Sequence, residues 1–408
     1  MDRTFRVVTL NCWGLPLPDW TGVVKDRQYR IRQIASSLAK GNYDVVALEE
    51  IWAYEDYEII RDAVAEVLPY CHYFHSGVIG SGLCVYSRHR ILDTLTFRYS
   101  LNGFPHHLHV GDWLGGKGVG LAQLALEIGT TSVLVNVYVT HIHAEYDRAN
   151  DPYLAHRLVQ AIELSQFIKF TSTGAHLVVA LGDFNLEPVD LGYDLITLNS
   201  QLTDCWLQPS NGSEADKCEG NTCERPDNRY ADPKVQKDYP MGKRIDYVMY
   251  RSSASLDTSL SRCYIDLNQI PDVEGQNFSD HTAVCAEFRL AKTDIVEVAS
   301  TPGSSATESP RSALQPYLER ALTIVEERDR MVGRDRMFYS GYIFALLFLF
   351  FQVIGIELQY PSLAIVALIL RFFLTLLVGF CLWHGVIGLT LERKSLRGGA
   401  AVIEKLIK

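Results

Sequence analysis

The sequence predicts an α/β sandwich, in which two β-sheets pack together with helices outside, followed by a hairpin of two membrane-spanning helices. Three observations support this prediction. Short apolar runs that are typical of buried strands alternate with helical patterns through residues 1–292. Several of the predicted strands end in polar residues. Two long apolar runs occupy most of the last 70 or so residues.

Apolar spacing defines the elements one by one. Short apolar runs predict strands, which in chain order cover 5–10, 44–48, 81–86, 119–126, 132–140, 177–181, 243–250 and 283–290. Apolar residues three or four positions apart predict helices over 23–40, 56–68 and 153–170. Residues 93–117 are expected to be irregular. So is the polar stretch 199–240, because Gly, Asn, Asp and Pro recur throughout it.

Glycines mark the ends of two of these elements. Gly41 stops the helix 23–40. Gly182 ends the strand before it, and Asp183 and Asn185 follow one residue apart. Alternate residues at a strand end point the same way, so these two side chains can face one point in space. A plain strand-to-turn exit uses the same residue types, so this stretch alone does not decide between turn and site.

Composition excludes some classes of protein. With 408 residues, the chain is long for a single domain. Its net charge of -10 argues against broad nucleic-acid affinity, which needs a basic face, so we expect no nucleic-acid partner. The nine cysteines lack regular spacing and form no zinc signature, so free thiols are expected. No signal peptide is evident at the N-terminus, which favours a cytosolic catalytic domain.

Polar residues of metal-ligand or acid–base type recur at the predicted strand ends. They are Asn11, Glu50, His141, Asp183, Asn185, Asp246, Asp280 and His281. One such residue is usually a cap or a turn former, but eight are difficult to treat as background. Carboxylate and amide oxygens without paired thiols favour a hard cation, Mg²⁺ or Mn²⁺, over zinc.

Six ordered motifs carry a resemblance to a known family. They lie at 10–14, 48–52, 141–146, 182–185, 244–247 and 279–281. In this order they resemble the endonuclease/exonuclease/phosphatase superfamily, and 77–83 and 153–157 resemble its neutral sphingomyelinase branch. The resemblance covers residues 5–290. It implies the DNase I-like fold, a four-layer α/β sandwich of two packed sheets flanked by helices.

The resemblance implies the metal ligands. Glu50 matches the principal Mg²⁺ ligand, with Mn²⁺ as a substitute, and Asn11 assists at the metal. Asp280 lies beside the metal or just behind its ligands. Glu49, the first acid of its pair, is expected to be structural.

The resemblance also implies the catalytic residues. His281 matches the general base that activates the attacking water, and Asp246 orients its imidazole. Asp183 helps to position the water or the metal, and Asn185 binds a phosphate oxygen. His141 matches the histidine on the leaving-group side.

Residues 112–117 resemble a switch segment of membrane neutral sphingomyelinases. There the lysine, here Lys117, pairs with Asp112 in one state and with the catalytic asparagine, here Asn185, in the other. The alternative is a solvated loop with a chance ion pair. Arg244, in the motif 244–247, is expected on the substrate side. His143 is expected either just behind the site residues or at the surface, and the surface position is favoured.

The implied reaction is in-line attack of water on the phosphodiester of sphingomyelin in a membrane, which gives ceramide and phosphocholine. A phospholipase C acting on lyso-phosphocholine lipids and an inositol-phosphate phosphatase are alternatives on the same fold. A nuclease is disfavoured by charge, and a non-enzymatic membrane scaffold by the complete set of catalytic residue types. The residues that bind choline are not assigned.

The two apolar runs predict a membrane hairpin. Residues 338–356 carry no formal charge over 19 positions, which at about 1.5 Å per residue matches the roughly 30 Å hydrocarbon core. We expect spans at about 337–356 and 366–390, followed by a basic tail, 392–408. Arg371 lies either near the far interface or against a partner helix. Basic residues flank both spans but are absent from the turn between them, so both ends are expected in the cytosol.

The segments before the hairpin complete the expected domain plan. Residues 1–292 form the catalytic domain, and 293–312 are linker by composition. Residues 313–336 predict an amphipathic juxtamembrane helix that docks on the membrane surface, on the domain or on a partner copy. A homodimer through the juxtamembrane or spanning helices is one expected arrangement. The expected location is the endoplasmic reticulum or another endomembrane, with the plasma membrane as the alternative.

Overall fold

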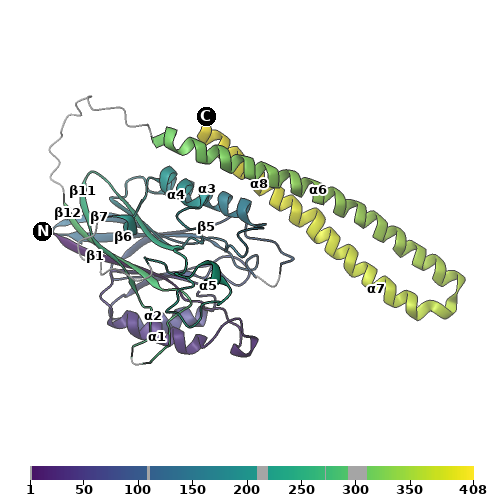
Figure 1. The fold of residues 1–408 in the computed structure, drawn as a ribbon, viewed down its shortest axis with the longest axis horizontal. Coiled ribbons are helices and arrows are strands. Elements are labelled where there is room, and N and C mark those ends of the chain that lie inside the picture. The colour runs from purple at the N-terminus through teal and green to yellow at the C-terminus, as the bar shows by residue number, and fades with distance from the viewer. Residues whose placement is uncertain (1, 108–110, 209–218, 272, 293–309) are drawn as a thin grey trace.

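Two six-stranded sheets form the core of the first domain (Figure 1). The computed structural model describes residues 2–408 except 108–110, 209–218, 272 and 293–309. The first sheet has the order β11-β12-β1-β2-β4-β3 and the second the order β5-β6-β7-β8-β10-β9. The strands of the first sheet are β1 Arg3–Asn11, β2 Val45–Glu49, β3 Tyr70–Phe74, β4 Leu83–Ser87, β11 Leu256–Asp266 and β12 Ala283–Lys292. Those of the second are β5 Ile91–Arg98, β6 Gly118–Ile128, β7 Thr131–His141, β8 Leu177–Asp183, β9 Thr203–Asp204 and β10 Asp246–Ser252.

Helices cover the outer faces of both sheets. The first sheet is covered by α1 Arg27–Lys40 and α2 Tyr54–Val64, and the second by α3 Leu154–Thr171 and α4 Leu191–Ser200. A third apolar cluster fills the space between the sheets, with Val7, Val137 and Val179 among its members. A short helix, α5 Val235–Asp238, lies in the excursion before β10. The predicted α/β sandwich is therefore confirmed.

Several elements depart from the sequence prediction, among them β5, β11 and α4. The strand β5 extends to Arg98, into the stretch expected to be irregular; it is an edge strand, most of its residues are exposed, and polar residues interrupt its apolar ones. The strand β11 and the helix α4 were not predicted at all. The strand β11 is the edge of the other sheet, and most of its residues are only partly buried, so it lacks an apolar run.

A long helical hairpin follows the domain (Figure 1). The helix α6, Pro310–Gln359, is continuous over 50 residues. A short turn, Pro361–Leu363, leads into α7 Ala364–Cys381, a π-helical segment Leu382–Gly388, and α8 Leu389–Ile407. Among the described residues, two helical segments are long and apolar enough to cross a membrane. The predicted linker lies outside the described residues up to 309, and its last residues belong to α6.

The ends of the hairpin dock on the catalytic domain. In the predicted juxtamembrane stretch, Leu318, Ala321 and Val325 are buried in the cluster that covers the second sheet. The expected tail is helical as α8, and Leu396 and Ile403 are buried in the same cluster. The juxtamembrane helix therefore packs on the domain, which is one of its three predicted docking sites.

Arg371 pairs within the hairpin. Its Nη2 lies 2.8 Å from Glu357 Oε2, which belongs to α6 near the tip. This pair is the expected contact with a neighbouring helix, here the other arm of the same hairpin.

Candidate active site

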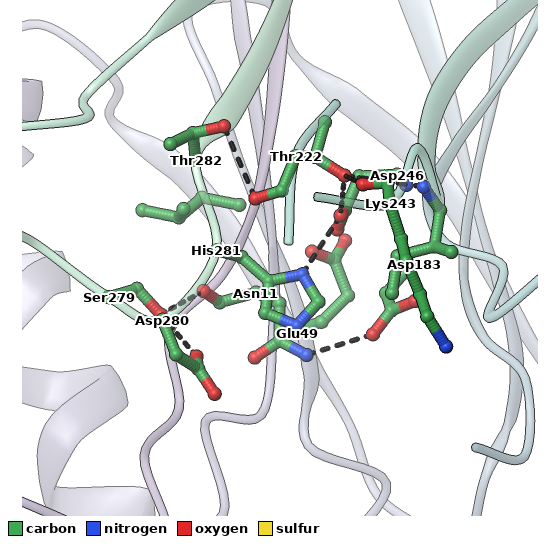
Figure 2. Close-up of polar contacts among 12 residues, drawn as sticks. Asn11, Glu49, Asp183, Thr222, Lys243, Asp246, Ser279, Asp280, His281 and Thr282 are labelled. Atoms are coloured by element: carbon green, nitrogen blue, oxygen red, sulfur yellow. Dashed lines mark hydrogen bonds and ion pairs between the residues drawn. The ribbon is translucent and has the colours of Figure 1, made fainter. Parts of the chain in front are cut away.

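The strand register gathers the predicted residues at one edge of the two sheets. His141 at the end of β7 lies opposite Asp183 at the end of β8, because these strands are parallel. Asp183 is also opposite Asp246, the first residue of the antiparallel β10. In the other sheet, Asn11 at the end of β1 lies opposite Glu49 at the end of β2. Polar residues from five strands thus meet where the sheets face each other (Figure 2).

A histidine–aspartate pair forms one side of the site. His281 Nδ1 lies 2.8 Å from Asp246 Oδ2, and both side chains are buried. Burial lowers the pKa of His281, but the Asp246 carboxylate outweighs it and raises that pKa well above its usual value. The hydrogen bond to Nδ1 leaves Nε2 as the ring nitrogen for chemistry.

An asparagine joins the two acids opposite this pair. Asn11 Nδ2 donates to Glu50 Oε1 at 3.1 Å and to Asp183 Oδ2 at 3.0 Å. Its oxygen accepts the backbone N–H of Trp13 at 3.0 Å. The Glu49 side chain does not bond to Asn11: it is fully buried and accepts a hydrogen bond from Thr9 Oγ1 at 2.7 Å.

The donor set fits a divalent cation. Atoms of Asp183, Asp246 and His281 lie within 4.8 Å of one another, which is a geometry that could hold a metal ion. Burial, and next the charge of Asp280, raise the pKa of Glu50. Burial and the charge of Asp246 raise the pKa of Asp183 to about 7. A cation would offset this crowding of buried carboxylates.

Lys117 and Asp112 form a buried ion pair beside His141. Lys117 Nζ lies 2.8 Å from Asp112 Oδ1 and donates to His141 Nε2 at 3.0 Å. The expected alternative of a solvated pair does not apply, because both side chains are buried. Burial, and then the Lys117 charge, lower the pKa of His141 well below its usual value, so its ring is neutral. Burial raises the pKa of Asp112, but the Lys117 charge leads the effects that lower it overall.

Asn185 lies in the turn directly after β8. Its Nδ2 donates to the carbonyl oxygen of Ile142 at 3.1 Å. Its backbone N–H donates to Asp183 Oδ1 at 2.9 Å, and its φ is 46°. A positive φ in an asparagine turns the chain directly after β8, so the side chain is fixed close to Asp183.

Two expectations about individual residues change. His143 is not a surface residue: it is buried, and its Nε2 lies 3.5 Å from Asp112 Oδ2. Arg244 is not brought among the other predicted site residues. It is buried in an ion pair with Asp204 at 2.6 Å, and its guanidinium lies over the Tyr247 ring, so its contacts hold β9 and β10 together.

Asp280 borders the site rather than joining the hydrogen-bonded group of Asn11, Glu50 and Asp183. Its Oδ1 accepts a hydrogen bond from Ser279 Oγ at 3.0 Å (Figure 2). Its negative charge raises the pKa of the Glu50 carboxyl. The structure therefore brings Glu50 and Asn11 into direct contact and leaves Asp280 as a charge beside them.

Sequence reasoning missed Thr222. Its Oγ1 donates to Asp246 Oδ2 at 2.5 Å, and its carbonyl oxygen accepts a hydrogen bond from Thr282 Oγ1 at 3.3 Å (Figure 2). Thr222 thus holds the carboxylate that orients His281. It lies in the polar excursion, where no periodicity identifies it.

Comparison with known proteins agrees with this geometry. The endonuclease/exonuclease/phosphatase family matches residues 8–281, and the chain belongs to that family. Its relatives group it with the neutral sphingomyelinases, which makes it an enzyme. A putative neutral sphingomyelinase of Caenorhabditis elegans is 41% identical over 99% of this chain and 91% of its own length. Sphingomyelin phosphodiesterase 2 of Homo sapiens is 38% identical over 78% of this chain and 71% of its own length.

The solved structures give the same fold. The crystal structure of SmcL matches with a TM-score of 0.51 at 18% identity, and the match covers 70% of this chain and 98% of SmcL. The predicted DNase I-like fold and the predicted family are both confirmed.

Proposed function

We propose that this protein is a membrane-anchored phospholipase C-type enzyme that hydrolyses sphingomyelin to ceramide and phosphocholine. The observation that carries the proposal is the His281–Asp246 pair, which lies at one sheet edge with Asn11 and Asp183. The names of the relatives support the choice of substrate. Lyso-phosphocholine lipids and inositol phosphates are the alternative substrates.

His281 acts as the general base. Its Nε2 takes a proton from the attacking water, while Asp246 accepts the Nδ1 proton in a hydrogen bond and stabilises the imidazolium that forms. The raised pKa of His281 agrees with this stabilisation. Thr222 keeps the carboxylate in place.

Hydrogen-bond donors on the opposite side stabilise the negative charge of the transition state. The Asn185 amide donates to a phosphoryl oxygen. His141 is neutral, so we assign it a hydrogen bond to the phosphorane or the leaving oxygen rather than a full charge. Lys117 is the cation on this side, and in this structure its Nζ donates a hydrogen bond to His141 Nε2. It must leave that nitrogen before His141 can contact the substrate, which supports the exchange of Lys117 between Asp112 and Asn185.

The resident metal is Mg²⁺, with Mn²⁺ as a substitute. Glu50 would hold it, with Asp280 beside it, and when bound it would polarise the phosphoryl oxygens. In this structure the Asn11 oxygen is engaged by the Trp13 N–H, so Asn11 acts by orienting Glu50 and Asp183 through its amide.

The hairpin anchors the enzyme in the bilayer that contains the substrate. We place the spans at about 337–356 and 366–390, with the catalytic domain and both ends in the cytosol, at the endoplasmic reticulum or another endomembrane. Buried Leu318 and Leu396 fix the hairpin ends to the domain. A homodimer would use the hairpin faces that stay exposed.

The test is a substrate panel with purified full-length protein in mixed micelles and Mg²⁺. Sphingomyelin, a lyso-phosphocholine lipid, inositol polyphosphates and plasmid DNA are compared, and we expect phosphocholine release from sphingomyelin. His281→Ala and Asp183→Ala should each reduce that release by a factor of about 100 or more. The exposed His75→Ala is the matched control and should retain activity. Absence of phosphocholine release, or release that both site variants leave unchanged, would reject the proposal.

A further inference from the structure

A loop next to the active site presents apolar side chains to solvent. In residues 14–24, here called the Trp20 loop, the exposed fractions are 42% for Leu17, 86% for Trp20 and 51% for Val23. Three large apolar residues within seven positions are more than scattered surface hydrophobicity, and they mark a surface that meets an apolar partner.

The loop is held in this shape. Arg30 is fully buried, and its guanidinium donates to the carbonyl oxygens of Cys12 and Trp13 at 2.7 and 2.8 Å. The Nε of the same guanidinium donates to the backbone carbonyl oxygen of Lys25 at 2.8 Å. One cation therefore joins both ends of the loop. This closed-end geometry is that of an Ω-loop, a class of loop that is frequently functional.

The tip of the loop has its own internal bonds. The backbone N–H of Thr21 donates to the carbonyl oxygen of Pro18 at 3.0 Å, and the backbone N–H of Gly22 donates to the carbonyl oxygen of Asp19 at 3.0 Å. They form a single 3₁₀ turn, Asp19–Thr21, which ends at Gly22 with a φ of 72°. Trp20 lies in this turn, so the fold holds its ring outward rather than leaving it free to collapse onto the domain.

The position of the loop indicates the partner. It begins three residues after Asn11, and the backbone N–H of Gly14 donates to Glu50 O at 3.0 Å, so its base lies at the candidate metal site. In Figure 1 the loop is the deep purple segment that projects beyond α1. It extends on the side of the domain toward which the α6–α7 hairpin points.

We infer that the Trp20 loop inserts into the surface of the bilayer that the hairpin spans. Trp and Leu suit this position, because an amphipathic indole prefers the membrane–water interface. The hairpin and the loop then form two contacts with one leaflet, and Asn11 and Glu50 lie at the base of the second contact. The inference rests on the membrane anchoring in the proposed function and adds a second attachment beside the catalytic site.

Fluorescence tests the insertion without relying on activity. Full-length protein is reconstituted into phosphatidylcholine vesicles with and without brominated acyl chains, which quench tryptophan on contact. The chain has six tryptophans, so the Trp20 signal is the difference between wild type and Trp20→Phe. We expect this difference signal to be quenched at least twofold by bromine. The matched control is Trp206→Phe, whose difference signal should be unchanged.

Kinetics test the consequence. The double variant Leu17→Ser/Trp20→Ser should lose about tenfold in the rate on sphingomyelin in vesicles, and retain the rate on a lyso-phosphocholine lipid below its micellar concentration. Phe170→Ser removes another exposed aromatic residue, 75% exposed, from the far end of α3 and should change neither rate. Circular dichroism checks that the variants are folded.

The outcomes separate the two proposals. If wild type hydrolyses no phosphocholine lipid, the proposed function fails, and the quenching still decides the inference. If bromine leaves the Trp20 signal unchanged, the inference is wrong even when the enzyme is active. A Trp20 signal that depends on protein density and not on bromine would assign the loop to a second copy of the chain, which also overturns it.

Discussion

Lys117 Nζ and Asn185 Nδ2 donate to the same acceptor, the carbonyl oxygen of Ile142, each at 3.1 Å. The two donors therefore lie beside one carbonyl group. Lys117 is at the same time paired with Asp112 at 2.8 Å. An exchange of Lys117 from Asp112 to Asn185 needs only a change of partner around Ile142, which gives the proposed switch a short physical path.

Lys117→Ala tests this arrangement. We expect kcat on sphingomyelin to fall at least tenfold, because Asp112 loses its cation and His141 loses its charged neighbour. Removing one partner of a buried ion pair also costs about 3–5 kcal/mol of stability. The rate must therefore be expressed per folded molecule, from a parallel measurement of thermal unfolding. Lys169→Ala, whose Nζ reaches only Asn199 at 3.5 Å, is the matched control. Full activity in Lys117→Ala would contradict the switch.

The metal requirement separates two adjacent acids. EDTA should abolish phosphocholine release and Mg²⁺ should restore it. Glu50→Gln should raise the Mg²⁺ concentration for half-maximal activity by a factor of about 10–100, because Glu50 lies at the crowded carboxylate site. Glu49→Gln is the matched control: its side chain bonds Thr9, so it should alter stability and leave the Mg²⁺ requirement unchanged. The reverse pattern would exchange the roles of the two residues.

The site edge could be predicted from the sequence because strand pairing is regular. His141, Asp183 and Asp246 each stand at a strand end, and the register of β7, β8 and β10 brings them side by side. The residue types at the ends of apolar runs were enough to indicate one shared site. The parallel strands β7 and β8 end at one edge of the sheet and the antiparallel β10 begins there, so the three residues share that edge.

Long-range packing could not be predicted. Thr222 reaches Asp246 only because Cys223 pairs with His281 in an isolated bridge, and nothing in the local sequence encodes that contact. His143 is buried because the ring of Tyr153 stacks on it at 4.2 Å. The strand β11 carries polar residues at an edge, so its pattern resembles a loop.

Gly182→Ala tests how the backbone places Asp183. Gly182 has a φ of 138°, and a Cβ there would lie 2.1 Å from the carbonyl oxygen of Thr140 on the neighbouring strand. We expect a loss of about 2–4 kcal/mol in the free energy of unfolding, from strain and overpacking together. Activity should fall more than stability accounts for, because Asp183 moves. Gly129→Ala, at a φ of 61° with nothing near its Cβ, carries the backbone strain alone and should leave kcat unchanged.

Glu392 is expected to hold α8 on the domain. Its Oε1 accepts from Arg328 Nε at 2.8 Å and lies 3.3 Å from His156 Nε2, so it links α8 to both α6 and α3. Burial raises the pKa of Glu392, but the hydrogen bond from His156 leads the effects that lower it overall. A lowered pKa means that the carboxylate stabilises the docked state above the usual glutamate pKa, roughly 4.3, and that this stabilisation is lost as the pH falls through the lowered value.

Glu392→Gln should therefore loosen α8 at neutral pH. The expected cost is about 1–3 kcal/mol, because charged hydrogen bonds become neutral ones. Hydrogen–deuterium exchange of the α8 amides gives the readout, and their protection in wild type should decline toward acid pH while the variant shows a flatter dependence. Glu404→Gln is the matched control on the same helix, since Glu404 makes only an exposed pair with Lys408 at 3.8 Å. Equal α8 protection in Glu392→Gln and Glu404→Gln would show that apolar contacts such as Leu396 suffice to dock the helix.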